Sequence, residues 1–310
     1  MLVKTIVSFP GFGIGNFSVD NEAFSFGDSF AVYWYGIIIV IGIIAAFAYG
    51  TYRGKFEGVC FDDCVDIALF TVIAGVIGAR LYYVLTSLDE FIPDPFYLGV
   101  FIKNVINIRG GGLAIYGGII GGAIAILAMT KIKKLNFFKM GDIAVMGLLV
   151  GQTIGRWGNF VNREAYGGDT NSLFAMKIDT WYHGVSVQEG VTYIDEANRY
   201  IQVHPTFLYE SMWNLMLFIL IMIFRKKKQY NGQVILWYFA GYGIGRTIIE
   251  GMRTDQLILF GTGIPVSQAL SALLAVGSII ALVYFGIKYK GRESVWGEDL
   301  KKIPKEEKNR

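Results

Sequence analysis

Apolar residues in this sequence are gathered into long runs that are separated by shorter polar segments. A run of about 20 apolar residues is long enough to cross the hydrocarbon core of a membrane as an α-helix. Seven runs approach this length, and they occupy residues 31–50, 65–86, 110–130, 139–157, 205–224, 233–251 and 259–287. The pattern predicts an all-α polytopic membrane protein with about seven transmembrane helices.

The polar segments between the runs predict a small part of the protein outside the membrane. Residues 1–30 are interpreted as an extracytoplasmic N-terminal segment, because their apolar stretch is too short for a cleaved signal peptide. Residues 158–204 contain "VTYI" and "RYIQVHP", which have strand-like composition, so we expect a small extracytoplasmic head there. Residues 92–108 are too broken to span and are expected to lie along the outer interface as an amphipathic arm.

Positive charge sets the predicted orientation. Of the 28 Lys and Arg residues, 18 follow the first, third and fifth runs or fall in the tail at residues 288–310. Because cytoplasmic loops are enriched in Lys and Arg, we expect the N-terminus outside and a basic tail in the cytoplasm. Helices one to four would then occupy residues 31–157, and helices five to seven residues 205–287. The composition also favours a membrane protein over a soluble one, since 17% of the residues are charged, against about 25% in soluble domains.

Four other arginines fall inside or at the edge of the predicted spans: Arg80, Arg156, Arg246 and Arg253. An Arg near the middle of a membrane helix costs about 2.5–3.5 kcal/mol on insertion scales. Such residues normally face a cavity or a partner, so the search for a functional site concentrates on these four.

The sixth run carries one polar stripe. Its members recur at helical spacing and are Tyr242, Arg246, Glu250 and Arg253. An ion pair between Arg246 and Glu250, one turn apart, would explain one arginine without any ligand. Two arginines with a carboxylate and a phenol on one face fit a polar cavity better.

The fourth run carries a second stripe, formed by Gln152, Arg156 and Asn159, and Asn162 and Glu164 follow it. Guanidinium and amide N–H donors suit a phosphate or a carboxylate. An interfacial Arg that snorkels to water is the alternative for Arg156. The amides and the carboxylate beside it favour an anion site, and the anion most available inside a membrane is a phospholipid head group.

Other positions give weaker signals. Glu210 and Asn214 share a face of the fifth run, and His204 precedes that run at the outer interface, where a structural or a direct role is open. Gly117 and Gly121 in the third run have the spacing of tightly packed membrane helices.

The sequence gives no signal for a metal ion or another cofactor. Cys60 and Cys64 are interpreted as two unpaired thiols at a helix start, because no His or second Cys pair lies nearby.

Six motifs in order resemble one family, the bacterial prolipoprotein diacylglyceryl transferases. "GRWGNFVNREAYGG" is similar to the family signature G-R-x-G-N-F-x-N-x-E-x-x-G. The other matching motifs are "YWYG", "GARLYYV", "RGGGLAIYGG", "HPTFLYE" and "YGIGRTIIEGMR", and together they cover most of residues 30 to 260.

This resemblance implies a multi-pass enzyme of the bacterial cytoplasmic (plasma) membrane. Such an enzyme transfers the diacylglyceryl group of phosphatidylglycerol to the thiol of the lipobox cysteine of prolipoproteins and releases glycerol phosphate, in the first step of lipoprotein maturation. The implied partners are phosphatidylglycerol, prolipoprotein signal peptides and membrane lipids, with no nucleic acid and no cofactor.

The resemblance also implies roles for individual residues. Arg156 and Arg246 match the two required arginines of the family, and Tyr35 matches a tyrosine of the first span. By the same resemblance, Asn159, Asn162, Glu164 and Gly167 belong to the lipid-binding signature, and Tyr242, Glu250 and Arg253 accompany Arg246 on its helix, with Glu250 expected to act in catalysis. His204 is counted among the substrate-binding residues because of its place at the outer interface. Arg156 and Arg246 are expected to hold the leaving phosphate from two sides.

The third-run motif departs from some family members, which carry a His where this chain has Tyr116. An unperturbed Tyr has a pKa near 10 and is a poor base, so Tyr116 is expected to orient a substrate or donate a hydrogen bond. The proton acceptor for the thiol therefore stays open among Glu250, Glu164 and His204, with Tyr116 a weaker candidate.

Two other classes of function fit the arginines alone. An anion transporter could line its path with them, but transporters commonly show repeated halves, and no repeat is visible here. A non-catalytic lipid-binding scaffold would need only the arginine stripe.

Overall fold

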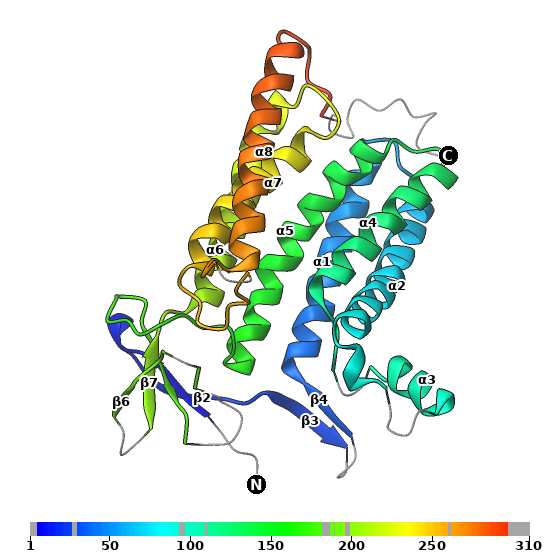
Figure 1. Ribbon diagram of the computed structural model, residues 1–310. Helices are drawn as coiled ribbons and strands as arrows, with labels where there is room; N and C mark the ends of the chain where they lie inside the picture. Colours follow the sequence, from blue (N-terminus) through cyan, green and yellow to red (C-terminus); the bar gives the residue numbers. More distant parts are fainter. Residues whose placement is uncertain are drawn as a thin grey trace. The chain divides into compact units, whose positions relative to one another are not determined.

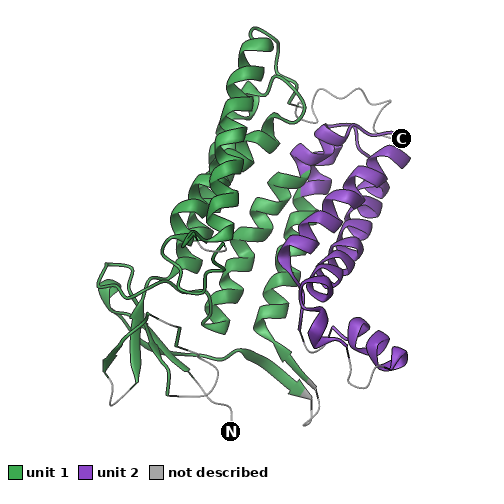
Figure 2. Cartoon of the chain, viewed as in Figure 1, with its two compact units in different colours: residues 1–49, 144–296 green, residues 50–143, 297–310 purple. Residues whose placement is uncertain are grey.

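The computed structural model describes residues 5–26, 30–92, 97–108, 111–181, 187–188, 190–195, 199–259 and 262–296 (Figure 1). The chain forms two compact units, one of residues 1–49 and 144–296 and the other of residues 50–143 and 297–310 (Figure 2). Most of the predicted basic tail lies outside the described residues.

Six helices in the described part of the chain are long and apolar enough to cross a membrane. They are α1 (Trp34–Phe56), α2 (Phe61–Thr86), α4 (Ile115–Ile132), α5 (Phe137–Asn162), α6 (Thr206–Phe224, continued to Lys227 by a short 3-10 turn, η3) and α8 (Val266–Lys288). This confirms a mostly helical, polytopic membrane protein. A further helix, α7 (Gln233–Glu250), coincides with the sixth predicted run, but it is not among these six.

Two of the spans begin later than the apolar runs suggested, α4 at Ile115 and α8 at Val266. Gly111 and Gly112, just before α4, have φ angles of 89° and 78°, which lie in the left-handed region and interrupt a helix. Pro265 stands directly before α8 and has extended backbone, so the helix starts after it.

The first unit contains a small sheet and a helical layer. The strands of the sheet are β1 (Thr5–Phe9), β2 (Ile14–Val19), β5 (Met176–Asp179), β6 (Tyr193–Asp195) and β7 (Tyr200–Val203), in the order β2-β1-β5-β7-β6 and all antiparallel. The strands expected from "VTYI" and "RYIQVHP" are confirmed as β6 and β7. Two further strands, β3 (Glu22–Phe26) and β4 (Phe30–Tyr33), form a separate hairpin.

The core of this sheet joins it to the membrane helices. Val7, Ile178, Ile201 and Val203 are fully buried, and they cluster with Phe207 of α6. Further from the sheet, α5, α6 and α7 pack around a second apolar core that includes Met146, Leu149, Ile221 and Val234. The ends of α5 and α6 are therefore held by the sheet.

In the second unit, α2 and α4 pack at close range. A Cβ atom added to Gly117 would lie 2.2 Å from the carbonyl oxygen of Gly78, and one added to Gly121 would lie 2.2 Å from that of Ala74. The predicted glycine-mediated helix packing is confirmed. Helix α3 (Leu98–Ile106) has 9 residues and is about 14 Å long, too short to cross a membrane.

The same unit gives Arg80 of α2 a structural role. Its guanidinium donates five hydrogen bonds of 2.7–2.9 Å to backbone carbonyl oxygens between residues 104 and 112. These bonds attach the last turn of α3, and the residues between α3 and α4 that accept them, to α2. Cys60 and Cys64 are confirmed as free thiols.

Candidate active site

Glu210, in the first turns of α6, stands between two arginines of neighbouring helices. Its Oε1 accepts a hydrogen bond of 2.6 Å from Nη2 of Arg156 on α5 and one of 3.3 Å from the hydroxyl of Tyr242 on α7. Its Oε2 accepts one of 2.9 Å from Nη1 of Arg246, also on α7. One carboxylate therefore connects three helices of the first unit.

Burial makes this carboxylate and its arginines depend on one another. Only 3% of the Glu210 side chain is exposed, against 23% for Arg156 and 14% for Arg246. A buried charge is tolerated only when it is paired and hydrogen-bonded. Two guanidinium groups also repel each other at this range, so Glu210 supplies the charge that allows them to lie together.

Three members of the polar stripe predicted on the sixth run, Tyr242, Arg246 and Glu250, lie on α7, whereas Arg253 follows the end of the helix at Glu250. Nη2 of Arg246 lies 2.5 Å from Oε2 of Glu250, so the ion pair within the helix also forms. Nε of Arg253 lies 4.0 Å from the same oxygen, and the Ser267 hydroxyl donates to Oε1 of Glu250. The stripe is one side of a larger cluster that includes α5 and α6.

Arg253 lies at the edge of this cluster and has a carboxylate of its own. Its Nε and Nη2 donate to the two oxygens of Asp255 at 2.8 and 2.6 Å. Burial alone would raise the pKa of Asp255, but the Arg253 guanidinium outweighs this effect and lowers the pKa below its usual value.

The residues after Arg156 extend the cluster outward. Nη1 of Arg156 donates to Oδ1 of Asn159 at 3.2 Å, and Nδ2 of Asn159 donates to Oε1 of Glu164 at 2.8 Å. Glu164 is exposed, and among the described residues it forms no hydrogen bond or ion pair with an arginine. Asn162 is the last residue of α5 and is partly buried.

Tyr35, at the start of α1, packs on the same helix end. A Cβ atom added to Gly158 would lie 2.9 Å from Cδ2 of Tyr35, so only a glycine permits this contact. The ring therefore covers α5 between Arg156 and Asn159. Tyr35 itself is 37% exposed.

Gly167 and His204 fasten the sheet segment to the end of α7. The Gly167 N–H donates to the carbonyl of His204, and the Gly168 N–H donates to that of Met252. A Cβ atom at Gly167 would lie 2.7 Å from the Met252 carbonyl oxygen. The imidazole of His204 contacts the Tyr209 hydroxyl at 3.1 Å, and burial lowers its pKa.

Tyr116 belongs to α4, in the second unit. Its ring centroid is 6.3 Å from that of Tyr82 on α2. Its role at the site remains a prediction.

The residue that sequence reasoning missed is Glu210. The sequence pattern places Glu210 on one face with Asn214 but assigns it no role in the site. Glu210 is the only acidic residue in the run at 205–224, and an ionisable residue inside a membrane span usually has a partner there. That signal could have led from the two arginines to Glu210.

Arg156 and Arg246 together offer unused hydrogen-bonding capacity. In the described part of the chain, the contacts above use only the two terminal nitrogens of each guanidinium, so each Nε–H still lacks a protein acceptor. Each guanidinium carries five N–H donors, and donors that are left without a protein acceptor suit an anion such as a phosphate.

The fold and this site define a class: a polytopic helical membrane protein with an arginine–carboxylate cluster enclosed by its helices. Comparison with known sequences narrows the class. The sequence model of the family described as prolipoprotein diacylglyceryl transferase matches residues 21–284. The chain belongs to this family and is a transferase, which confirms the resemblance drawn from the motifs.

The sequences of individual relatives match this chain over most of its length. It is 40% identical over 263 residues to the phosphatidylglycerol–prolipoprotein diacylglyceryl transferase of Clostridioides difficile, covering 85% of this chain and 94% of that protein. The protein of the same name from Finegoldia magna is 39% identical over 274 residues, with 88% and 96% covered. That of Clostridium perfringens, numbered 1, is 41% identical over 263 residues, with 84% and 92% covered.

Proposed function

We propose that this chain transfers the diacylglyceryl group of phosphatidylglycerol to the lipobox cysteine thiol of prolipoproteins and releases glycerol phosphate. The names of its relatives give phosphatidylglycerol and prolipoprotein as the substrates of those enzymes. The observation that carries the proposal is the pair of arginines from α5 and α7 that Glu210 holds together inside the helical layer.

The chemistry is a displacement at the glycerol carbon that bears the phosphate. The thiolate sulfur forms a bond to this carbon, the bond from carbon to the phosphate oxygen breaks, and its electron pair leaves on glycerol phosphate. Negative charge grows on that oxygen in the transition state. Preorganised N–H donors stabilise such charge, and Arg156 and Arg246 supply them.

The two arginines have different tasks in this proposal. Arg156 is the more exposed and contacts one carboxylate, so it makes the first contact with the lipid phosphate. Arg246 is more deeply buried between Glu210 and Glu250, so it is held rigidly where charge develops. Glu250 acts here by positioning Arg246, and Tyr242 by supporting Glu210.

The thiol needs a proton acceptor, and its pKa falls beside arginines. Glu210 and Glu250 are both occupied by Arg246. Glu164 is exposed and is linked to Arg156 only through Asn159, so we favour Glu164 as the acceptor. Gly167, Asn162 and Tyr35 would shape the surroundings of the lipid head group.

The seventh span and the orientation also belong to the proposal. Helix α7 packs on α6 and α8, and its Arg246 and Glu250 face partners on other helices, which explains how a less apolar helix would be tolerated in the membrane. We place the N-terminus and the head at 158–204 outside, and the tail at 288–310 in the cytoplasm. The location would be the bacterial cytoplasmic membrane, with residues 92–108 as an arm at its outer interface.

The direct test uses purified protein in detergent with phosphatidylglycerol and a synthetic signal peptide that carries the acceptor cysteine. Mass spectrometry detects the diacylglyceryl adduct, and a coupled assay detects glycerol phosphate. We expect both products from the wild type and neither from Arg246→Ala. Folded, lipid-binding protein that yields no adduct would reject the transfer reaction in favour of a lipid-binding scaffold.

A further inference from the structure

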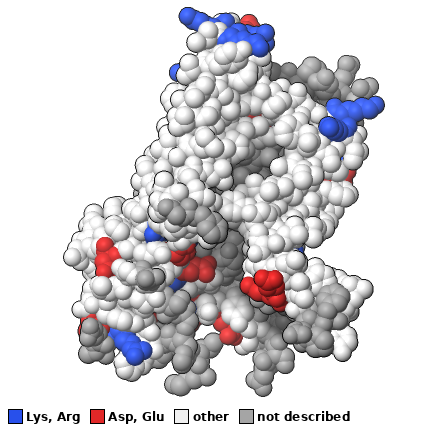
Figure 3. Space-filling model, viewed as in Figure 1, with Lys and Arg blue, Asp and Glu red and all other residues white. Residues whose placement is uncertain are grey.

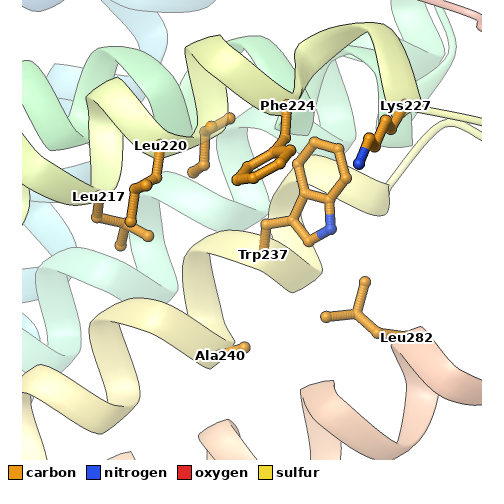
Figure 4. Close-up of a pocket in the computed structure, with 8 residues that line it drawn as sticks. Leu217, Leu220, Phe224, Lys227, Trp237, Ala240 and Leu282 are labelled. Carbon is orange, nitrogen blue, oxygen red and sulfur yellow. The ribbon is translucent and has the colours of Figure 1, made fainter.

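An apolar groove with a volume of about 400 Å³ lies on the first unit at the opposite end of α6 from Glu210. Figure 4 shows side chains from three helices along it: Leu217, Leu220 and Phe224 of α6, Trp237 of α7 and Leu282 of α8, with Lys227 at one end. Its position on α6 separates it from the cluster. Phe224 is 14 residues beyond Glu210, or about 21 Å along the helix.

The groove is open on the outer surface of the helices. Leu220 and Phe224 are 40% and 44% exposed, whereas Leu217 and Ile221 form its buried floor. In a membrane, this surface faces acyl chains. Because a lipid tail is as apolar as the groove, burial of a tail here gives no net preference for one lipid over another.

Charge supplies the preference that the apolar wall lacks. Lys227 is the last residue of the candidate span Thr206–Lys227, so its ammonium lies where lipid head groups begin. The ammonium is held 4.9 Å from the ring centroid of Phe224, over the end of the groove. Figure 4 shows it beside the indole of Trp237.

The surroundings of Lys227 are strongly basic. Residues 225–232 and 286–296 contain seven Lys and Arg residues and a single carboxylate, Glu293. The two segments lie together, since the Val295 N–H donates to the carbonyl of Lys228. Figure 3 shows blue surface gathered at this end of α8.

The length of the groove matches one leaflet. Leu217 and Lys227 are ten residues apart, which is about 15 Å along a helix. The hydrocarbon core of a bilayer is about 30 Å thick, so one leaflet is about 15 Å deep. A chain that starts at a head group beside Lys227 would reach Leu217 near the middle of the membrane.

We propose that this groove binds one anionic phospholipid, with its phosphate at Lys227 and one acyl chain along Leu220, Phe224 and Trp237. With the orientation given above, this lipid belongs to the cytoplasmic leaflet. The site is separate from the transfer reaction and requires no turnover.

The test uses the fluorescence of Trp237, which bromine atoms on an acyl chain quench on contact. The full-length protein is reconstituted in phosphatidylcholine vesicles that contain, at the same low mole fraction, either brominated phosphatidylserine or brominated phosphatidylcholine. Phosphatidylserine is anionic but is not the substrate proposed for the active site, so a failure of the transfer reaction does not affect the result. The difference between wild type and Trp237→Phe isolates the Trp237 signal.

We expect brominated phosphatidylserine to occupy the site about fivefold more than brominated phosphatidylcholine, the preference that one lysine gives near a head group. Lys227→Gln should abolish this preference. Lys226→Gln, which changes a neighbouring exposed lysine that does not line the groove, should retain it.

Three results would overturn the proposal. Equal quenching of Trp237 by both brominated lipids would mean that the groove meets only bulk lipid. Absence of Trp237 quenching by either lipid would mean that another protein surface, such as a second copy of the chain, fills it. Equal losses in Lys226→Gln and Lys227→Gln would mean that the surface charge acts without a defined site.

Discussion

Glu210 shows how a single side chain determines what its neighbours can do. Without it, Arg156 and Arg246 would be two like charges in a poorly solvated place, and one of them would have to move. With it, both guanidinium groups are fixed before any substrate arrives. Fixed donors need little reorganisation during reaction, which is the physical basis of the proposed catalysis.

The unequal exposure of the two arginines predicts a kinetic difference. Lysine keeps the charge but loses the planar donor geometry of arginine. We expect Arg156→Lys chiefly to raise the KM for phosphatidylglycerol, and Arg246→Lys to lower kcat by about 10²–10³-fold. Steady-state rates of adduct formation over a range of lipid concentrations measure both. Arg199→Lys, an exposed change in the sheet segment, is the control.

The same change in KM and kcat for both lysine variants would contradict this division of tasks. It would show that the two arginines act as one unit, despite their different burial.

The burial of His204 predicts that the stability of the folded protein depends on pH. Burial lowers its pKa in the folded protein, so the unfolded chain binds the proton more readily. The stabilising contribution is therefore complete above the unfolded value of about 6.5 and is lost as the pH falls from there through the folded pKa. We expect His204→Asn to remove this part of the decrease in melting temperature between about pH 7.5 and pH 5. Parallel curves for the wild type and the variant would show that His204 does not contribute.

At the scale of helices, close contact between α6 and α7 keeps the cluster assembled. Gly245, next to Arg246, lies directly against the Trp213 indole, and a Cβ atom there would be 2.1 Å from Nε1. That indole cannot easily move, because its N–H donates to the Gly241 carbonyl at 2.9 Å. The distance between Glu210 and Arg246 therefore depends on a residue that takes no part in the chemistry.

Gly245→Ala is expected to push α6 and α7 apart and to lower both the melting temperature and the rate of adduct formation. The matched control is Gly277→Ala in α8, where a Cβ atom would meet nothing within 4 Å. That change should be neutral or slightly stabilising, since alanine favours a helix over glycine by about 1 kcal/mol. Equal effects of the two substitutions on rate and melting temperature would contradict the packing argument.

The helices and their polar stripes could be predicted because these features are local. A stripe such as Tyr242, Arg246 and Glu250 follows from helical spacing alone, and so does the packing of Gly117 and Gly121. The pairing of Arg246 with Glu210 could not be predicted in this way, since it depends on how two helices are rotated against each other. Helix starts were misplaced where glycines or a proline interrupt an apolar run, as before α4 and α8.

At the scale of the whole molecule, long-range strand pairing also escaped prediction. Val7 of β1 pairs with Ile178 of β5, about 170 residues further along the chain, and both side chains are fully buried. The sequence marked the segment at 158–204 as partly strand-forming but contained no sign that residues 5–19 complete the same sheet. Three strands of this sheet, β5, β6 and β7, lie between α5 and α6 in the chain, and so the sheet supports the two helices that carry Arg156 and Glu210.

The measurement that tests the account most directly is adduct formation by Glu210→Gln. This change keeps the shape of the side chain and removes its charge, so Arg156 and Arg246 lose their common partner. We predict a rate at least about 10²-fold below that of the wild type, in protein that still elutes as a folded species. Glu293→Gln, an exposed carboxylate at the other end of the first unit, should retain the wild-type rate. A Glu210→Gln protein as active as Glu293→Gln would contradict the claim that Glu210 organises the active site.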